Sequence, residues 1–150
     1  WPAGIPAGQV REDVVSSLDL LPTFAAAAGV NPVENADGIN LLPYLIDDEN
    51  AVGERVLHWR RDHMTDCALR LGKYKWVENR NRNETWLTDL EKDIGEKINL
   101  ADQYPEVVER LRALYLKWES TAPEPAFKSG WSPASEAADA KEKAGYQKNN

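Results

Sequence analysis

The residues best suited to chemistry begin with the run His58-Trp59-Arg60-Arg61. An aromatic ring flanked by an imidazole and two guanidinium groups can bind an anion through charge-assisted hydrogen bonds. The alternative is that Trp59 packs at the end of a strand while the arginines extend their charged ends into solvent. The residues alone leave both interpretations open.

Two further groupings in the same stretch could carry chemistry. Asp62, His63 and Asp66 could hold a cation, although three such residues in a loop between strands are more often solvated. A thiol and a nearby imidazole, here Cys67 and His63, are the fewest groups that can form a nucleophilic pair. The alternative is that Cys67, at the start of an apolar strand, is a buried and unreactive thiol. We therefore predict no catalytic residue and no metal ligand among these 150 residues.

The charge of the chain is distributed unevenly. The net charge is −7, whereas proteins that bind nucleic acid generally carry a basic surface. No stretch approaches the ~18 consecutive apolar residues that a membrane-spanning helix needs. We expect neither nucleic acid nor membrane as a partner. Residues 55–82, however, carry a net +5, which would suit an anionic substrate or partner. Ordinary exposed strands also carry such charges.

Four short runs of aromatic and β-branched residues predict an antiparallel sheet. They cover positions 56–59, 68–71, 74–77 and 85–88. Apolar residues alternate with charged ones in the second and third runs, and Gly72-Lys73 fits a tight turn between them. The apolar face of this sheet requires a cover, since each buried large side chain contributes about 1.5–3 kcal/mol. A helix beginning at Pro105, with apolar residues at helical spacing, is the expected cover.

A shorter helix is predicted over residues 18–28. Ser16, Ser17 or Asp19 can cap its start, and Gly29 can end it. Because almost none of its surface is polar, this helix is expected to be buried against something larger. A loop and a short strand near residues 13–15 are predicted to precede it.

Several stretches taken together resemble the C-terminal part of the sulfatase family, which has an alkaline-phosphatase-like fold. The similar stretches, in the family's order, are Trp1–Gly8, Val15–Thr23, Asp37–Leu45, Leu57–Arg60, Ala68–Val77, Asp89–Leu90, Gly95–Ala101 and the helix from Pro105. Thr88 departs from the pattern, because the family usually has an aromatic residue there.

The resemblance implies a sulfuric ester hydrolase whose reactive centre lies outside this chain. Sulfatases use a formylglycine made from the first residue of Cys-x-Pro-x-Arg, beside a calcium ion, both in the larger N-terminal domain. Cys67 is not that cysteine, because Leu69 and Leu71 stand where proline and arginine are required. We therefore expect no cofactor in this chain, calcium in the parent's other domain, and no activity from the 150 residues alone.

The implied fold class is α+β. It is a small antiparallel sheet of about four strands packed against a C-terminal helix, preceded by the last strand and helix of an absent α/β catalytic domain. Residues 1–50 would be the last segment of the catalytic domain and its connection to the C-terminal subdomain. Residues 51–127 would form that subdomain, and residues 128–150 would be a flexible tail. The expected partner is the N-terminal catalytic domain of the same polypeptide.

Substrate contact by this chain is the remaining hypothesis. In similar enzymes the C-terminal subdomain can border the substrate cleft, so His58, Trp59, Arg60 and Arg61 are predicted to contact the non-sulfate part of a sulfated small molecule or saccharide. Two alternatives stay open, namely a related phosphodiesterase or phosphonate hydrolase, and a stand-alone module that binds an anion or a protein. The sequence indicates no cellular compartment.

Overall fold

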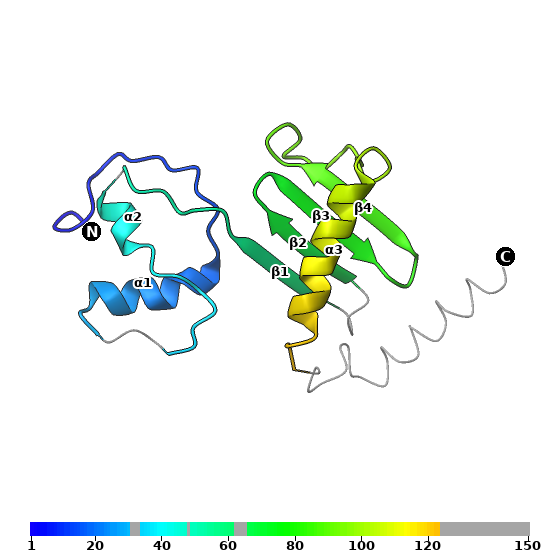
Figure 1. Ribbon diagram of the computed structural model, residues 1–150. Helices are drawn as coiled ribbons and strands as arrows, with labels where there is room; N and C mark the ends of the chain where they lie inside the picture. Colours follow the sequence, from blue (N-terminus) through cyan, green and yellow to red (C-terminus); the bar gives the residue numbers. More distant parts are fainter. Residues whose placement is uncertain (31–33, 48, 62–65, 124–150) are drawn as a thin grey trace, which may run out of the picture. The chain divides into compact units, whose positions relative to one another are not determined.

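The computed structural model describes residues 1–30, 34–47, 49–61 and 66–123. The chain divides into two compact units, Trp1–Leu57 and His58–Asn150. The predicted division at residue 50 stays a prediction, and the proposed tail 128–150 lies outside the described residues. The helices and strands are η1 (Ser17–Asp19), α1 (Leu20–Ala27), α2 (Leu42–Ile46), β1 (Val56–Arg61), β2 (Asp66–Leu71), β3 (Tyr74–Asn79), β4 (Glu84–Asp89) and α3 (Pro105–Glu119). Figure 1 labels the α-helices and the strands.

The four strands form one sheet, as the sequence predicts, and their order in it is β1-β2-β3-β4. β2 and β3 are antiparallel and pair Leu69 with Trp76, while β3 and β4 are antiparallel and pair Trp76 with Leu87. The two-residue turn between β2 and β3 begins at Gly72, whose φ of +55° is readily adopted only by residues such as glycine.

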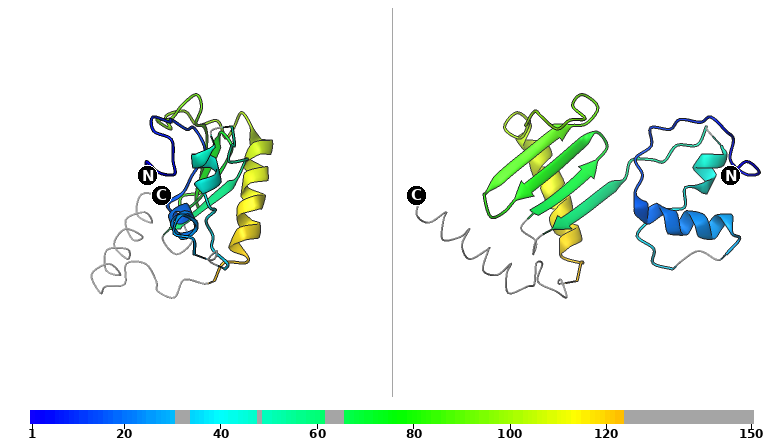
Figure 2. Two further views of the ribbon diagram at one scale, coloured as in Figure 1. Left: turned by 90° about the vertical axis from the view of Figure 1, so that its left-hand side faces the viewer. Right: turned by 180° about the vertical axis from the view of Figure 1, so that it is seen from behind.

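α3 covers one face of this sheet, which confirms the predicted role of the helix from Pro105 (Figures 1 and 2). The shared core consists of fully or almost fully buried side chains, namely Cys67, Leu69, Trp76, Leu87, Leu111 and Tyr115. An ion pair at the edge of this core fastens α3 to the end of β3. Arg80 donates from Nη1 and Nη2 to the two carboxylate oxygens of Glu119, both at 2.9 Å.

The first unit has the predicted helix but not the predicted strand. α1 forms, and Gly29 follows it with a φ of +68°, as expected for a helix stop. Residues 13–15 belong to no strand, so that prediction was wrong for the described chain. A strand is stable only with a partner strand beside it, and the described part of residues 1–57 supplies none before β1.

α1 is apolar, and much of its surface is open in this structure. Leu20 is 49% exposed, Leu21 60% and Phe24 64%. Thr23 is the only buried residue of the helix. Among the described residues no helix is long and apolar enough to cross a membrane.

Candidate functional site

The run His58–Arg61 lies in β1, where side chains alternate between the two faces of the sheet. His58 stacks on Trp118 of α3, with the ring centroids 4.8 Å apart and the planes 8° from parallel. Arg60 lies over the same indole at 5.8 Å from the ring centroid, and its Nη2 donates to the carbonyl oxygen of Pro123 at 2.9 Å. His58 and Arg60 therefore face α3.

Trp59 and Arg61 occupy the intervening positions and so face away from α3. Trp59 is 47% exposed. Arg61 donates from Nε to Asp66 of β2 at 3.1 Å, and Asn79 of β3 donates to the other oxygen of the same carboxylate at 2.6 Å. The structure thus splits the four predicted substrate-binding residues into two pairs on opposite faces of the sheet. It does not gather them around one point, and substrate contact by any of them stays a prediction.

The other groupings from the sequence do not form a reactive centre in the described residues. Asp62 and His63 lie outside those residues, and Asp66 is bonded by Arg61 and Asn79. Burial raises the pKa of the Cys67 thiol to about 11, and the side chain is 2% exposed, so the thiolate that a nucleophile requires is disfavoured. Within the described ranges no three His, Cys, Asp or Glu residues are placed to hold a metal ion.

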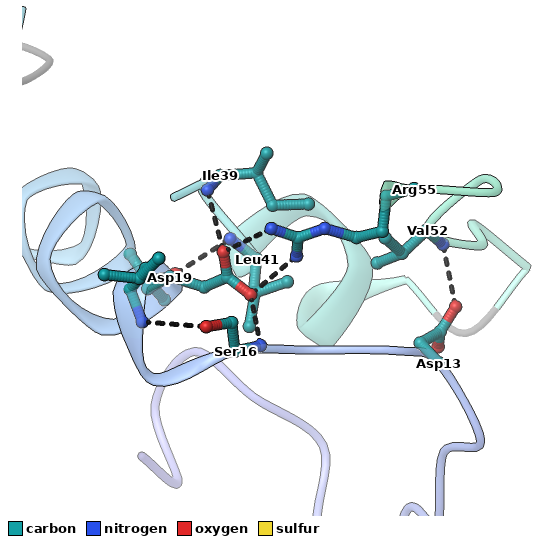
Figure 3. Close-up of polar contacts among 9 residues, drawn as sticks. Asp13, Ser16, Asp19, Ile39, Leu41, Val52 and Arg55 are labelled. Carbon is teal, nitrogen blue, oxygen red and sulfur yellow. Dashed lines mark hydrogen bonds and ion pairs between the residues drawn. The ribbon is translucent and has the colours of Figure 1, made fainter. Parts of the chain in front are cut away.

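The carboxylate of Asp19, which the sequence predicted only as a helix cap, accepts four hydrogen bonds from described residues of the first unit. It is fully buried. Its Oδ1 accepts hydrogen bonds from the backbone N of Ile39 and from Nη2 of Arg55, both at 2.9 Å. Its Oδ2 accepts from the backbone N of Ser16 at 2.7 Å and from Nη1 of Arg55 at 2.6 Å (Figure 3). We call these four residues the Asp19 clasp.

The Asp19 clasp joins three segments that are distant in sequence. Ser16 precedes α1, Ile39 precedes α2, and Arg55 precedes β1. Thr23 reinforces the connection between α1 and the segment before α2. Its Oγ1 donates to the carbonyl oxygen of Asp19 at 2.6 Å and accepts from the backbone N of Leu41 at 2.8 Å. Segments on both sides of α2 are therefore held to the start of α1.

The clasp is suited to holding structure rather than to binding a ligand. A carboxylate offers about four acceptor positions, and protein donors fill four here. Burial alone would raise the pKa of Asp19, but the hydrogen bonds from Arg55, Ile39 and Ser16 outweigh it and hold the pKa below its ordinary value of 3.8. The ionised form is the one that the fold stabilises.

The sequence predicts the contact between Ser16 and Asp19 but not the one between Asp19 and Arg55. The spacing Ser16-x-x-Asp19 matches a capping box, in which the Ser16 side chain accepts from the backbone N of Leu18 and Asp19 reaches back to Ser16. Ser16 and Asp19 were both among the predicted caps. Arg55 lies 36 residues further along the chain, and no local pattern connects it to Asp19.

A glycine beside the clasp provides a test of how tightly the segments are held. A Cβ on Gly38 would lie 2.1 Å from the carbonyl oxygen of Leu18, which is backbone and cannot rotate away. We expect Gly38→Ala to lower the free energy of unfolding by about 1–3 kcal/mol, as other overpacked sites do. Chemical denaturation would measure this. Gly53→Ala is the matched control, because a Cβ there meets no described atom within 4 Å; an equal loss in both variants would contradict the prediction.

The comparisons with known proteins agree on one family. Residues 1–120 match the family described as N-sulphoglucosamine sulphohydrolase, C-terminal. Human arylsulfatase A is 33% identical over an alignment of 146 positions that covers 77% of this chain and 28% of arylsulfatase A. The chain therefore spans less than a third of the length of this relative.

Solved structures also match most of this chain over part of their own length. The crystal structure of Ps i-CgsB superimposes with a TM-score of 0.71 at 29% identity, covering 96% of this chain and 32% of that protein. A phosphonate monoester hydrolase from Silicibacter pomeroyi superimposes with a TM-score of 0.60 at 20% identity, covering 81% of this chain and 28% of that one. At that identity the second likeness shows the fold alone.

Proposed function

This chain belongs to the sulfatase family and matches the C-terminal domain of its members. We propose that it is part of a sulfuric ester hydrolase. The match of residues 1–120 to the C-terminal family is the observation that supports this proposal most strongly. The 150 residues would supply scaffold. The formylglycine and calcium that the family resemblance implies would belong to the rest of the polypeptide, because the Cys-x-Pro-x-Arg motif is not among these 150 residues.

The partner of this chain would be the N-terminal catalytic domain of the same polypeptide. The apolar side chains of α1 support this part of the proposal. Leu20, Leu21 and Phe24 are each about half exposed or more, whereas the buried residues in the described part of the first unit are the polar Asp19 and Thr23. A unit with a polar interior and an apolar surface gains most of its burial from a partner.

Substrate contact would involve Trp59 and Arg61 rather than the whole predicted run. These two side chains share the face of the sheet that α3 leaves open, and Trp59 is 47% exposed. An indole can stack on the apolar face of a sugar ring, and a guanidinium can bind a second anionic group of a sulfated small molecule or saccharide. His58 and Arg60 contact Trp118 on the covered face. Arg61 contacts Asp66, but its side chain is still 77% exposed on the open face.

Assays on the intact enzyme would test the activity. We expect release of sulfate from an aryl sulfate and no comparable hydrolysis of a phosphodiester or a phosphonate monoester. Faster turnover of either phosphorus substrate would favour the alternative hydrolase. The isolated 150 residues are expected to show no turnover, and sulfate release by them alone would contradict the assignment of a scaffolding role.

Kinetics would test the two substrate residues separately from the reaction. In the intact enzyme we expect Arg61→Ala to raise KM for a charged saccharide sulfate by roughly tenfold, the scale of one lost charge-assisted hydrogen bond, with kcat little changed. Trp59→Ala should act in the same direction. Arg82→Ala removes an exposed cation from the turn after β3 and is the matched control. A KM equal to that of the control in both variants would contradict the contact but leave the sulfatase proposal intact.

A further inference from the structure

The face of the sheet opposite α3 carries a row of side chains that suits a protein interface. Ala68, Val77 and Trp86 lie directly opposite one another on β2, β3 and β4, and we call them the Trp86 row. Trp86 is 38% exposed, and its hydrogen bond to Thr88 holds the indole in place. The right-hand view of Figure 2 shows this face, with α3 behind the sheet. A rigidly held, open tryptophan is the type of residue that contributes most to binding between proteins.

Next to the Trp86 row, two cations face each other across β2 and β3. Arg70 lies directly opposite Lys75, and the alternation of the strands puts both side chains on the open face. Like charges in directly opposed positions destabilise a sheet. Lys75 is neutralised, because its Nζ lies 2.6 Å from Oε1 of Glu96. The unbalanced charge of the pair is therefore that of Arg70.

Arg70 is a half-buried cation, and most of its hydrogen-bonding capacity is unused within the described residues. Its Nε donates to the carbonyl oxygen of Gly72 at 3.2 Å, and no described carboxylate is bonded to it. A guanidinium has five N–H donors, and its planar end can bind a carboxylate through two parallel hydrogen bonds. Partial burial of a cation costs free energy, which an acid from outside the described residues would offset.

We propose that the open face, from the Trp86 row to Arg70, docks on the N-terminal catalytic domain, with Arg70 in an ion pair with an Asp or Glu of that domain. This inference rests on the proposal that the chain is part of a larger hydrolase. This chain covers 28% of arylsulfatase A and 32% of Ps i-CgsB, so most of each protein lies outside the match. A domain of the same polypeptide is present at a high effective concentration, which favours it over a separate partner.

The docked region and the proposed substrate contact lie toward opposite ends of this face. Arg61 is bonded to Asp66, which is four residues before Arg70 on β2. Four residues of a strand span about 13 Å, so one end of the face can be docked while Arg61 stays accessible to a substrate.

Zero-length cross-linking in the intact enzyme would identify the partner of Arg70. A carbodiimide joins an amine to a carboxylate where the two groups are in contact, and Arg70→Lys supplies the amine. We expect a cross-link, located by peptide mass spectrometry, from position 70 to an Asp or Glu of the catalytic domain. Lys75 and Glu96 are the internal positive control, since their charged atoms lie 2.6 Å apart. Arg82→Lys, in the exposed turn after β3, is the matched control and should give no link to that domain.

The outcomes separate this inference from the proposed function. The docking would be overturned by a position 70 that links only within these 150 residues or not at all, or by equal linking of Arg70→Lys and Arg82→Lys to the catalytic domain. If the link were absent and Arg70→Ala raised KM for a charged saccharide sulfate roughly tenfold, the anion at Arg70 would belong to the substrate instead. Because sulfate release is measured independently, an active sulfatase without the link would refute the docking alone.

Discussion

Replacing Asp19 with alanine is expected to destabilise the first unit by about 3–5 kcal/mol, the cost of removing one partner from a buried ion pair. The guanidinium of Arg55, whose side chain is 14% exposed, would lose both of its carboxylate contacts. The backbone N–H groups of Ser16 and Ile39 would lose their acceptor as well. Four hydrogen bonds depend on this single carboxylate, so its effect should exceed that of any surface substitution in the unit.

Chemical denaturation and amide exchange at Ile39 would measure the loss. Asp37→Ala is the matched control, because Asp37 is exposed and lies two residues from Ile39. The double variant Asp19→Leu with Arg55→Met should recover part of the loss, since it leaves neither charge buried alone. Equal stability of Asp19→Ala and Asp37→Ala would show that the clasp does not hold the unit together.

The same clasp predicts how this unit responds to acid. The pKa of Asp19 in the folded state lies below its ordinary value of 3.8, so folding favours the ionised carboxylate. Its contribution to stability is present above that ordinary pKa and is lost as the pH falls through the lower pKa of the folded state. A denaturation series from pH 6 to pH 2 should show this loss in the wild-type chain and not in Asp19→Asn. A parallel decline in both would assign acid sensitivity to other groups.

The sequence predicted those parts of the fold that depend on local pattern. Alternation in β2 and β3 and the helical spacing after Pro105 gave the sheet, its covered face and the helix that covers it. The prediction of a strand near residues 13–15 was wrong, because a strand also needs a partner strand beside it and the local pattern carries no information about one. For the same reason the bond between Asp19 and Arg55, 36 residues apart, was not predicted.

The predicted substrate-binding run shows a different limit of prediction from sequence. The run His58–Arg61 was treated as one chemical group, although a strand sends successive side chains to opposite faces. Once the run was predicted to be a strand, that alternation could have separated Trp59 and Arg61 from His58 and Arg60. What the sequence could not reveal is that Trp118, from a helix sixty residues away, engages both members of the second pair.

Trp76→Ala is the second change for which we expect a large effect, a loss of about 3–5 kcal/mol in the free energy of unfolding of the sheet and α3. The indole is fully buried between Leu69 and Leu87 on the neighbouring strands, and its ring centroid lies 5.5 Å from that of Tyr115. Alanine would leave a cavity where three strands and the helix meet, and the surrounding core is too tightly packed to fill it.

Trp86→Ala is the matched control, because it removes the same side chain from the next strand on the opposite face of the sheet. Trp86 is 38% exposed, and its Nε1 donates to Thr88 at 3.0 Å. Its loss should cost less than that of Trp76, because only part of the Trp86 indole is buried and its hydrogen bond contributes about 1 kcal/mol. Within the described residues Nε1 of Trp76 has no acceptor, so the larger cost of Trp76→Ala must come from packing. If the two variants were equally stable, the assignment of the core to the face beneath α3 would be wrong.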